Sequence, residues 1–451
     1  MFAEIWQRLT DWHPWDTWIV ITAALTAMAC SLPGLWLVLR KQSMMGDALS
    51  HTALPGVVVS FLAVTAARSL GWITEDQLDM GTQIALMLGA VLMGIVTTLL
   101  TEWLQKLAGI DGGASLGVVF TGLFAIGLVL IRTMADDLDL DPDCVLFGQL
   151  ESIVWRTWSI AGWEVPQATV LTAVMLGLNG LLTVLFFKEL RLASFDAELA
   201  TTQGINARTV HYLHMALTAA TVTAAFQSVG SILVIALLVV PAVTALQLSW
   251  RLRHVVVLTL LIAAISAGMG HVLAKVAPPL ICGPLGWPAV QDASTSGMVC
   301  VAAGLGFVAA LLLGPRGVVW NAWSRTVLAM RIADEDLLGQ LYRVEESTAT
   351  GDATAGVSWL VLLRLRWLEL VQRDTAGRIV LTESGQTRAR DIVRRHRLWE
   401  AYMQKHFALP DDHLHDTAHR VEHYIDPALL EALDAELETP ATDPHGKRIP
   451  G

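Results

Sequence analysis

The chain has 451 residues, of which 54% are hydrophobic and only 16% are charged, and its net charge at pH 7 is −11. This composition excludes a single soluble domain of the same length, and the acidic balance argues against a general nucleic-acid-binding surface. Long apolar runs stop near residue 316, and charged residues then become frequent. The sequence therefore predicts a membrane part followed by a soluble tail.

Nine apolar runs approach or exceed the length of about 20 residues that a helix needs to cross a bilayer. They cover approximately residues 17–39, 51–67, 83–102, 115–132, 167–187, 209–227, 229–249, 254–275 and 294–314. No basic segment precedes the first run, so we interpret it as a span rather than as a signal peptide. We therefore expect an all-α polytopic membrane domain over residues 1–315.

Basic residues follow alternate spans, and this bias sets the expected orientation in the membrane. They are Arg40, Lys41, Lys106, Lys188, Arg191, Arg208, Arg251, Arg253, Arg316 and Arg325. We expect the N-terminus outside the cell (inner or plasma) membrane and the tail in the cytoplasm. Cys144 and Cys282 then fall in outer loops, where a disulfide is chemically allowed, and the sequence leaves their pairing open.

The stretch "DALSHTALPG", residues 47–56, places Asp47, Ser50 and His51 on one helical face at the start of the second span. Ionisable side chains at a membrane span mark the path of an ion or a proton, and a carboxylate with an imidazole suits a divalent transition metal. The alternative is a helix cap, in which Asp47 caps a helix that begins near Ala48. The spacing alone does not decide between them.

This stretch resembles the signature of the manganese/zinc/iron family of ABC transporter permeases. Three further motifs occur in the order of that family: "LDPDCVLFGQL" at 140–150, "SFDAELATTQGI" at 194–205 and "ILVIALLVVPAVTA" at 232–245. The resemblance covers about residues 15–315 and implies that Asp47, Ser50 and His51 line the path of Mn, Zn or Fe. It also implies three partners: an ABC ATPase subunit, an extracytoplasmic metal-binding protein and a second permease subunit, identical or related.

The second motif of the three contains Phe195, Asp196, Ala197 and Glu198, a short amphipathic segment in an expected cytoplasmic loop. An apolar tip beside acids suits docking in a groove of a soluble partner, and Gly204 is expected to end the segment. The resemblance implies that this partner is the ATPase. The P-loop pattern G-x-x-x-x-G-K-[ST] does not occur in the sequence, so we expect no ATP hydrolysis by this chain itself.

The tail divides into an expected linker at 316–327, a winged-helix-like region at 328–395 and a helical region at 396–451. The run "LVQRDTAGRIVLTESG" predicts strand, turn, strand and then the start of a long helix, with Thr382 or Ser384 as N-cap. We therefore expect a small α+β winged-helix-like domain followed by a helical dimerisation region.

Histidines and acids recur at helical spacing in the last part of the tail. They are His396 and Glu400 in "HRLWE", then His415, His419, Glu422 and His423 in "HDTAHRVEH". The second group falls on one stripe of a helix, and imidazoles with a carboxylate suit Mn, Fe, Zn or Co. The alternative is a solvated charged helix face.

The tail also resembles metal-dependent transcriptional repressors of the DtxR/MntR type, through "HRLWE", "HDTAHRVEH" and the closing "DPHGKRIP". The resemblance implies metal ligands at the six positions just listed and at Asp336. Two features depart from that family. Gly339 stands where the family has a second acidic ligand, and the candidate recognition helix "VSWLVLLRLRWLELV" is apolar where a DNA reader is polar.

The leading hypothesis is the permease subunit of an ABC importer for a divalent metal ion, with a cytoplasmic tail that senses metal and regulates transport. The first alternative is a membrane-tethered, metal-dependent transcription regulator. The tail argues against DNA binding, because it carries 17 Lys and Arg against 21 Asp and Glu from residue 316 onward. The second alternative is a permease whose tail only promotes dimerisation.

Overall fold

The structure is a computed structural model of the whole chain. It describes residues 8, 10–70, 78–134, 148, 150–160, 162–282, 284, 292–347, 357–375, 377–407, 417–438 and 440–450. The chain separates into two compact units, Met1–Trp320 and Asn321–Gly451. Each is described by itself.

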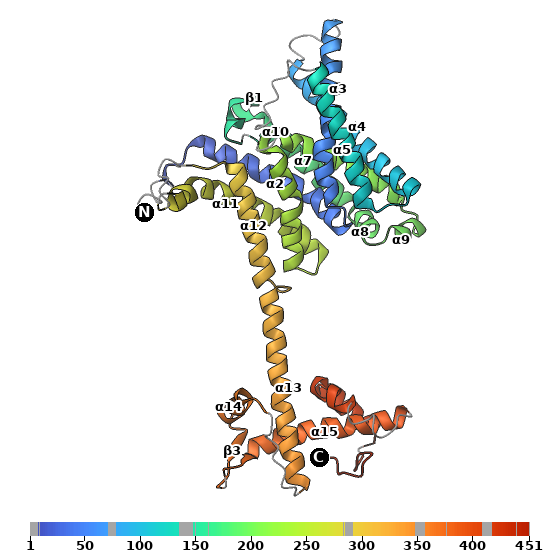
Figure 1. Ribbon diagram of the computed structural model, residues 1–451, viewed down its shortest axis with the longest axis vertical. Helices are drawn as coiled ribbons and strands as arrows, with labels where there is room; N and C mark the ends of the chain where they lie inside the picture. The colour runs from blue at the N-terminus through green and yellow to red at the C-terminus, as the bar shows by residue number, and fades with distance from the viewer. Residues whose placement is uncertain are drawn as a thin grey trace. The chain divides into compact units, whose positions relative to one another are not determined.

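The first unit is built from long apolar helices (Figure 1). They are α2 (Pro14–Leu39), α3 (Met44–Ser69), α4 (Leu78–Ala108), α5 (Gly112–Met134), α7 (Gln167–Leu185), α10 (Ala207–Leu248), α11 (Leu252–Cys282) and α12 (Thr295–Leu313). Within the described part of the chain, seven helices are long and apolar enough to cross a membrane, and Leu233–Leu248 is a shorter apolar helix. Each of the nine expected runs falls on one of these helices, so the α-helical polytopic fold is confirmed.

Two expected spans, 209–227 and 229–249, lie on the single element α10 rather than on helices separated by a loop. Gly230 interrupts the helical backbone between them with φ 75° and ψ 165°. Only glycine adopts this region without strain, because it has no Cβ atom. The chain therefore kinks at this residue and continues directly into the second half.

Small residues allow the helices to approach closely. α2 packs against α7, α10 and α11, while α3, α4 and α5 form a second group that also meets α10. A Cβ atom on Gly34 of α2 would lie 1.9 Å from the backbone oxygen of Leu238 in α10. Gly56 of α3 and Gly89 of α4 meet in the same way, with 2.3 Å from a Cβ on Gly56 to the oxygen of Gly89. Such contacts are typical of helix packing in membranes.

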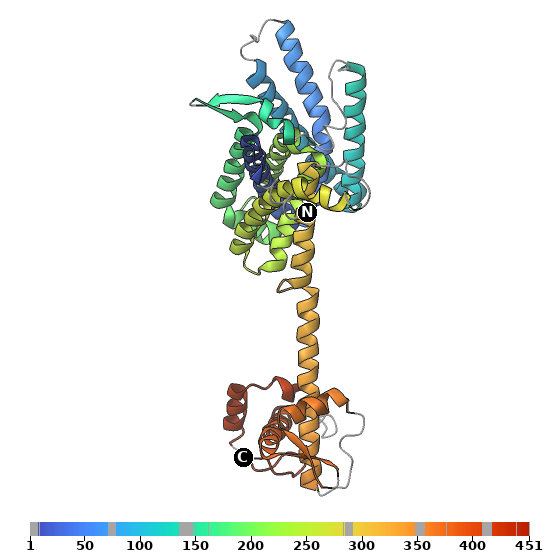
Figure 2. The ribbon, with the colours of Figure 1, turned by 90° about the vertical axis from the view of Figure 1, so that its left-hand side faces the viewer.

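Short elements connect the helices. The 3-10 helix η2 (Leu150–Trp155) leads into the antiparallel hairpin of β1 (Thr157–Ile160) and β2 (Trp163–Pro166), which projects from the helices in Figure 2. The short helices α8 (Phe187–Phe195) and α9 (Ala197–Thr202) join α7 to α10. Cys144 lies outside the described residues, so the structure does not test its pairing with Cys282.

The second unit has the expected helix, hairpin and helix. Its elements are α13 (Val318–Ser347), α14 (Trp359–Trp367), β3 (Val371–Arg373), β4 (Ile379–Leu381), α15 (Glu383–His406), η3 (Glu422–Tyr424) and α17 (Pro427–Glu436). β3 and β4 pair antiparallel. Thr382 caps α15 by accepting a hydrogen bond from Gly385 N at 3.0 Å, whereas Ser384 lies inside the helix. Leucines of α13 form the core with α14, the hairpin and Ile392.

The structure corrects one expectation about the tail. Residues 417–421 are α-helical, but the chain tightens into the 3-10 turn η3 at Glu422, so the expected stripe does not lie on one regular helix. Such tightening is common at the C-terminal end of an α-helix. His415 lies outside the described residues.

Candidate functional site

The metal-ligand candidates of the tail come together from two segments that are distant in sequence. Asp336 lies on α13, while His419, Glu422 and His423 lie in and just before η3. One donor atom from each of these four residues lies within 4.8 Å of the others. The structure therefore brings together four of the residues that the sequence analysis selected as regulatory ligands.

Glu422 is the centre of this cluster. Only 1% of its surface is exposed, and both carboxylate oxygens receive an imidazole. Nδ1 of His419 donates to Oε1 at 2.9 Å, and Nδ1 of His396 donates to Oε2 at 2.7 Å. His396 in turn places Nε2 3.0 Å from Oε1 of Glu400. The pair predicted from "HRLWE" is thus joined to the cluster through Glu422.

His423 is fixed by acids on both ring nitrogens. Nδ1 donates to Oε2 of Glu335 at 2.9 Å, and Nε2 lies 3.2 Å from Oδ1 of Asp336. The hydrogen bonds to Asp336 and to Glu335 raise the pKa of His423 to about 9, although burial opposes the shift. In the metal-free tail this ring is therefore protonated at neutral pH.

Burial and hydrogen bonding oppose each other at the remaining groups of the cluster. Burial lowers the pKa of His396, but the contacts with Glu400 and Glu422 outweigh it, so the net shift is upward. Burial raises the pKa of Glu335, yet the hydrogen bonds from His423 and Arg331 outweigh it and lower the pKa. The cluster is thus a set of imidazole and carboxylate groups in mutual contact, whose hydrogen bonds outweigh the effect of burial at His396 and Glu335.

The donor set fits a divalent transition metal. Ligand atoms about 2.1 Å from a metal ion lie at most about 4.2 Å apart, so donors already within 4.8 Å need only a small movement. Imidazole nitrogen and carboxylate oxygen are ligands for Mn, Fe and Zn. Gly339 offers no side-chain ligand, and a Cβ atom there would lie 3.3 Å from Nη2 of Arg343. Gly339 thus has a cationic neighbour at the position where the resemblance to the repressors implied an acid.

In the membrane unit, Asp47 and His51 contact each other on α3. Nε2 of His51 lies 3.4 Å from Oδ1 of Asp47, with 27% and 31% of the two side chains exposed. The imidazole also packs on Phe124 of α5, with ring centroids 5.3 Å apart. The pair is therefore partly open on one side and supported by an aromatic ring on the other.

The helix-cap alternative for Asp47 is wrong. α3 begins at Met44, so Asp47 lies inside the first turn and the capping position belongs to Ser43. A carboxylate in this turn is favourable beside the positive end of the helix dipole. Ser50, which is buried, donates its hydroxyl to the backbone oxygen of Asp47 at 2.7 Å. Its oxygen retains lone pairs that can accept a further contact.

The segment expected to dock a partner is exposed on the surface. Phe195 ends α8 with 67% of its surface exposed, and Ala197 and Glu198 beside it are also exposed. Asp196 caps α9 by accepting from Leu199 N at 2.9 Å. Gly204 follows α9 with φ 81°, as expected for a residue that ends a helix.

Arg40 anchors the base of this segment to the long helices. Its Nε donates to Oγ of Ser194 in α8 at 3.2 Å, and its Nη1 lies 3.1 Å from Nδ1 of His211 in α10. His211 continues to Glu102 of α4, with 3.6 Å between Nε2 and Oε1. The segment expected to dock a partner is thereby connected to three of the long helices.

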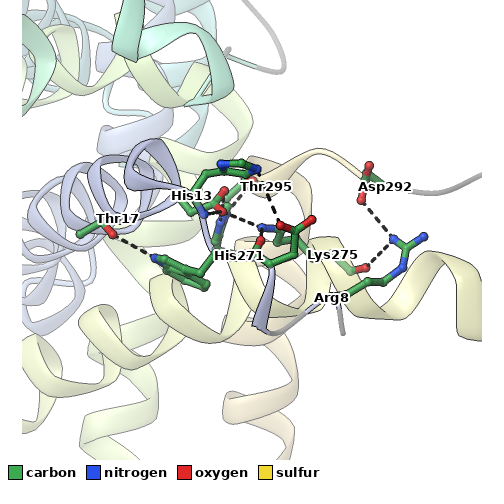
Figure 3. Close-up of polar contacts among 10 residues, drawn as sticks. Arg8, His13, Thr17, His271, Lys275, Asp292 and Thr295 are labelled. Carbon is green, nitrogen blue, oxygen red and sulfur yellow. Dashed lines mark hydrogen bonds and ion pairs between the residues drawn. The ribbon is translucent and has the colours of Figure 1, made fainter. Parts of the chain in front are cut away.

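A buried polar network around Asp16 of α2 was not expected from the sequence. Figure 3 labels its members His271, Lys275 and Thr295. Nζ of Lys275 donates to Oδ2 of Asp16 at 2.6 Å, and Nε2 of His271 lies 3.3 Å from Oδ1. His271 also meets Oγ1 of Thr295 at 3.2 Å, and Glu151 accepts the backbone N–H of Thr295 at 2.8 Å. The network joins α2, α11, α12 and η2. An i, i+4 pair of His271 and Lys275 inside an apolar run was the signal that could have revealed it.

A cavity of about 610 Å³ opens beside this network. It is lined by Arg8, Asp11, His13, Trp15, Asp16, Lys275 and Asp292. Each acid of the network already faces a cation or an N–H group, so the arrangement holds α2 against α11 rather than offering free ligands.

Comparison with known proteins covers both units. Residues 16–285 match the ABC 3 transport family, and residues 382–451 match the iron dependent repressor, metal binding and dimerisation domain. The chain is 33% identical over 313 residues to the manganese transport system membrane protein MntD of Bacillus subtilis, covering 69% of this chain and 96% of that protein. It is 32% identical over 356 residues to the zinc transport system membrane protein TroD of Treponema pallidum, covering 76% and 87%.

A solved structure is also similar. PsaBC from Streptococcus pneumoniae, in complex with Fab, matches with a TM-score of 0.51 and 25% identity over 70% of this chain and 97% of the solved chain. The residues of the Asp47–His51 pair and of the segment 195–198 lie inside the matched family range, and those of η3 lie inside the matched repressor range.

Proposed function

Because the chain belongs to the ABC 3 transport family, we propose that it is the permease subunit of an ATP-driven importer for a divalent transition-metal ion. Its relatives transport manganese or zinc, so Mn²⁺, Zn²⁺ and Fe²⁺ are the cargo candidates. The observation that carries the proposal is the match over 96% of a manganese permease together with the Asp47–His51 contact. We place the N-terminus outside the cell membrane and the tail in the cytoplasm.

Asp47 and His51 pass the ion along the transport path, with Ser50 beside them. The test is uptake of radiolabelled Mn²⁺, Zn²⁺ and Fe²⁺ by cells that express the chain with its partner proteins. Asp47→Ala and His51→Ala are expected to abolish uptake of the cargo ion, and His254→Ala, an exposed histidine of α11, serves as the matched control. Unchanged uptake of all three ions in both variants would remove the pair from the path.

The relatives are transport proteins rather than enzymes, and we propose that ATP hydrolysis belongs to a separate ABC ATPase subunit. The exposed segment Phe195–Glu198 docks on it, because an apolar tip flanked by acids fits a groove on a soluble partner. Phe195→Asp is expected to lower transport-coupled ATP hydrolysis in the assembled transporter. Trp163→Asp, on the exposed β1–β2 hairpin, is the control and should leave it unchanged.

Two further partners complete the proposed importer. A second permease subunit, identical or related, would pair with this chain, and an extracytoplasmic metal-binding protein would deliver the ion. Co-purification of two differently tagged copies decides between an identical and a related second subunit: an identical one predicts recovery of both tags.

We propose that the tail senses cytosolic metal and restrains import when that metal is abundant. The residues that would hold the ion are Asp336, His396, Glu400, His419, Glu422 and His423, with His415 implied by the family resemblance. Bound metal would supply positive charge among the carboxylates of this set. Such regulation requires the metal to bind one transporter conformation more tightly than the other.

DNA binding is not proposed for this tail. The exposed residues of α14, which stands where the repressors carry their reading helix, include Trp359, Leu363 and Trp367. Reading base edges requires polar side chains. A gel-shift with the full chain and its promoter region, with and without metal, should show no complex.

A further inference from the structure

Helix α14 carries an exposed apolar stripe that neither transport nor metal binding uses. Trp359, Leu360, Leu363 and Trp367 are 69%, 52%, 60% and 81% exposed. At about 100° per residue these four positions fall within an arc of about 100°. The surface of a soluble domain rarely exposes two tryptophans and two leucines side by side, so the stripe indicates an interaction surface.

The orientation of the stripe is fixed by the opposite face of α14. Val361 and Leu365 are buried in the core that α14 shares with α13 and the β3–β4 hairpin. The side chain of Ser358 caps the helix by accepting from Leu360 N. α14 therefore cannot rotate to bury its tryptophans without losing this core.

Arginines lie on both sides of the stripe. On the same helical geometry, Arg364 lies about 40° beyond Leu360 and Arg366 about 20° before Trp359. Arg364 also reaches Oδ2 of Asp334 at 3.3 Å, and in the described part of the chain no ion pair is found for Arg366. The stripe is thus bordered by positive charge on each side.

We propose that α14 lies in the headgroup layer of the bilayer that the permease spans, with its apolar stripe toward the acyl chains and its arginines on anionic headgroups. Tryptophan with leucine on one face and arginine at the border is typical of helices that lie in the membrane interface. The proposal rests on the membrane placement of the permease and is independent of the metal that it carries.

Two observations favour lipid over other occupants. The tail follows α12 in the same chain through α13, so it is tethered to the membrane unit, and this tether raises the concentration of lipid that the tail meets. A second copy of α14 facing the first would bring like arginine borders together, which is unfavourable, whereas anionic headgroups complement them.

The test uses the full chain in lipid nanodiscs with a spin label on Leu363→Cys. The exposed control is a label on Thr387→Cys of α15. Cys144, Cys282 and Cys300 are replaced by serine so that they take no label. Cys30 is kept, because it is fully buried. Collision of each label with oxygen, which partitions into lipid, is compared with collision with a water-soluble nickel chelate. Discs contain phosphatidylcholine with or without phosphatidylglycerol.

The expected result is that the label at 363 collides with oxygen more than with the chelate in discs with phosphatidylglycerol, and that the label at 387 shows the reverse. Removing phosphatidylglycerol, or adding Arg366→Glu, should restore chelate access at 363. Chelate access at 363 equal to that at 387 in every disc would overturn the proposal. Protection of the label from the chelate that does not depend on headgroup charge would overturn the proposal too. Dipolar broadening between the labels of two chains at 363 would also overturn it, because it would assign the stripe to a second copy.

Discussion

The two units place the same residue types in opposite environments. In the membrane unit, Asp47 and His51 form one contact of 3.4 Å and each side chain keeps about a third of its surface open. In the tail, Glu422 and His396 are 1% and 4% exposed and meet at 2.7 Å. These environments fit the two proposed roles, because a partly open pair can release an ion and a closed cluster can retain one.

The tail cluster and the Asp47–His51 pair also differ in the number of charged groups around them. The tail cluster joins His396, His419 and His423 to four carboxylates, so removal of any of these carboxylates leaves an imidazole with one partner fewer. The Asp47–His51 pair meets an aromatic ring of α5. The two proposed roles, passage of an ion and its retention, thus correspond to different densities of ligands around the same chemistry.

The largest expected effect concerns a third acid, Asp16, which is buried like the tail cluster but lies in the membrane unit. Asp16→Asn leaves Lys275 without its carboxylate, and we expect the free energy of unfolding to fall by roughly 3–5 kcal/mol. Asp47→Asn removes a half-open pair and should cost less than about 1 kcal/mol. Thermal unfolding in detergent measures both, and equal losses would contradict the distinction between a structural and a transport acid.

The next effect tests whether the closed cluster binds metal. Glu422→Gln removes the carboxylate that two imidazoles share, and we expect metal affinity of the tail to fall on the order of 100-fold. Metal binding is measured by calorimetric titration of the full chain carrying Asp47→Ala, so that binding at the proposed transport path does not contribute. Glu431→Gln on exposed α17 is the control. If neither variant nor parent binds metal tightly, the tail only promotes dimerisation.

A pH dependence follows from the raised pKa of His423. The folded pKa of about 9 lies above the usual 6.5, so protonated His423 stabilises the metal-free tail fully below pH 6.5 and this contribution is lost as pH rises through 9. We expect roughly 2–3 kcal/mol of stability to disappear over this window. Urea unfolding followed by circular dichroism at several pH values measures the loss. His423→Gln should flatten the curve, and an unchanged slope in that variant would assign the dependence elsewhere.

The smallest effect sharpens the role of Glu335, which contacts His423 but lies outside the four-residue ligand group. Glu335→Gln keeps the volume and weakens the hydrogen bond that orients the ring, so metal affinity should fall about 10-fold. Glu345→Gln on the same helix is the exposed control and should leave the affinity unchanged. A loss as large as that of Glu422→Gln would make Glu335 a ligand.

The helices and the hairpin were predictable because their signals are local. Apolar runs of membrane length marked each span, and alternating residues with a turn between them marked β3 and β4. Thr382 followed from its place before a long helix. The kink at Gly230 was not predictable, because nothing in an unbroken apolar run shows whether a loop or a backbone turn divides it.

The tail site was predicted in part by spacing and in part by resemblance. The i, i+4 pair His396 and Glu400 needs only one helix, whereas Asp336 comes from α13, more than eighty residues away from His419. Glu335 was not predicted, because the adjacent acids Asp334, Glu335 and Asp336 point in directions 100° apart on a helix. Only the packed fold decides which of them contacts Nδ1 of His423. The same reasoning explains the missed Asp16 network, whose members lie on four elements.

The most direct test of the account is the dependence of import on internal metal. Cells are preloaded with increasing cargo metal, and initial uptake of radiolabelled ion is measured for the parent chain and for His423→Ala and His396→Ala. The account predicts that internal metal slows uptake by the parent, while both variants keep the same initial rate at low internal metal and lose the inhibition. Identical inhibition in parent and variants would contradict the claim that the tail senses metal for the permease.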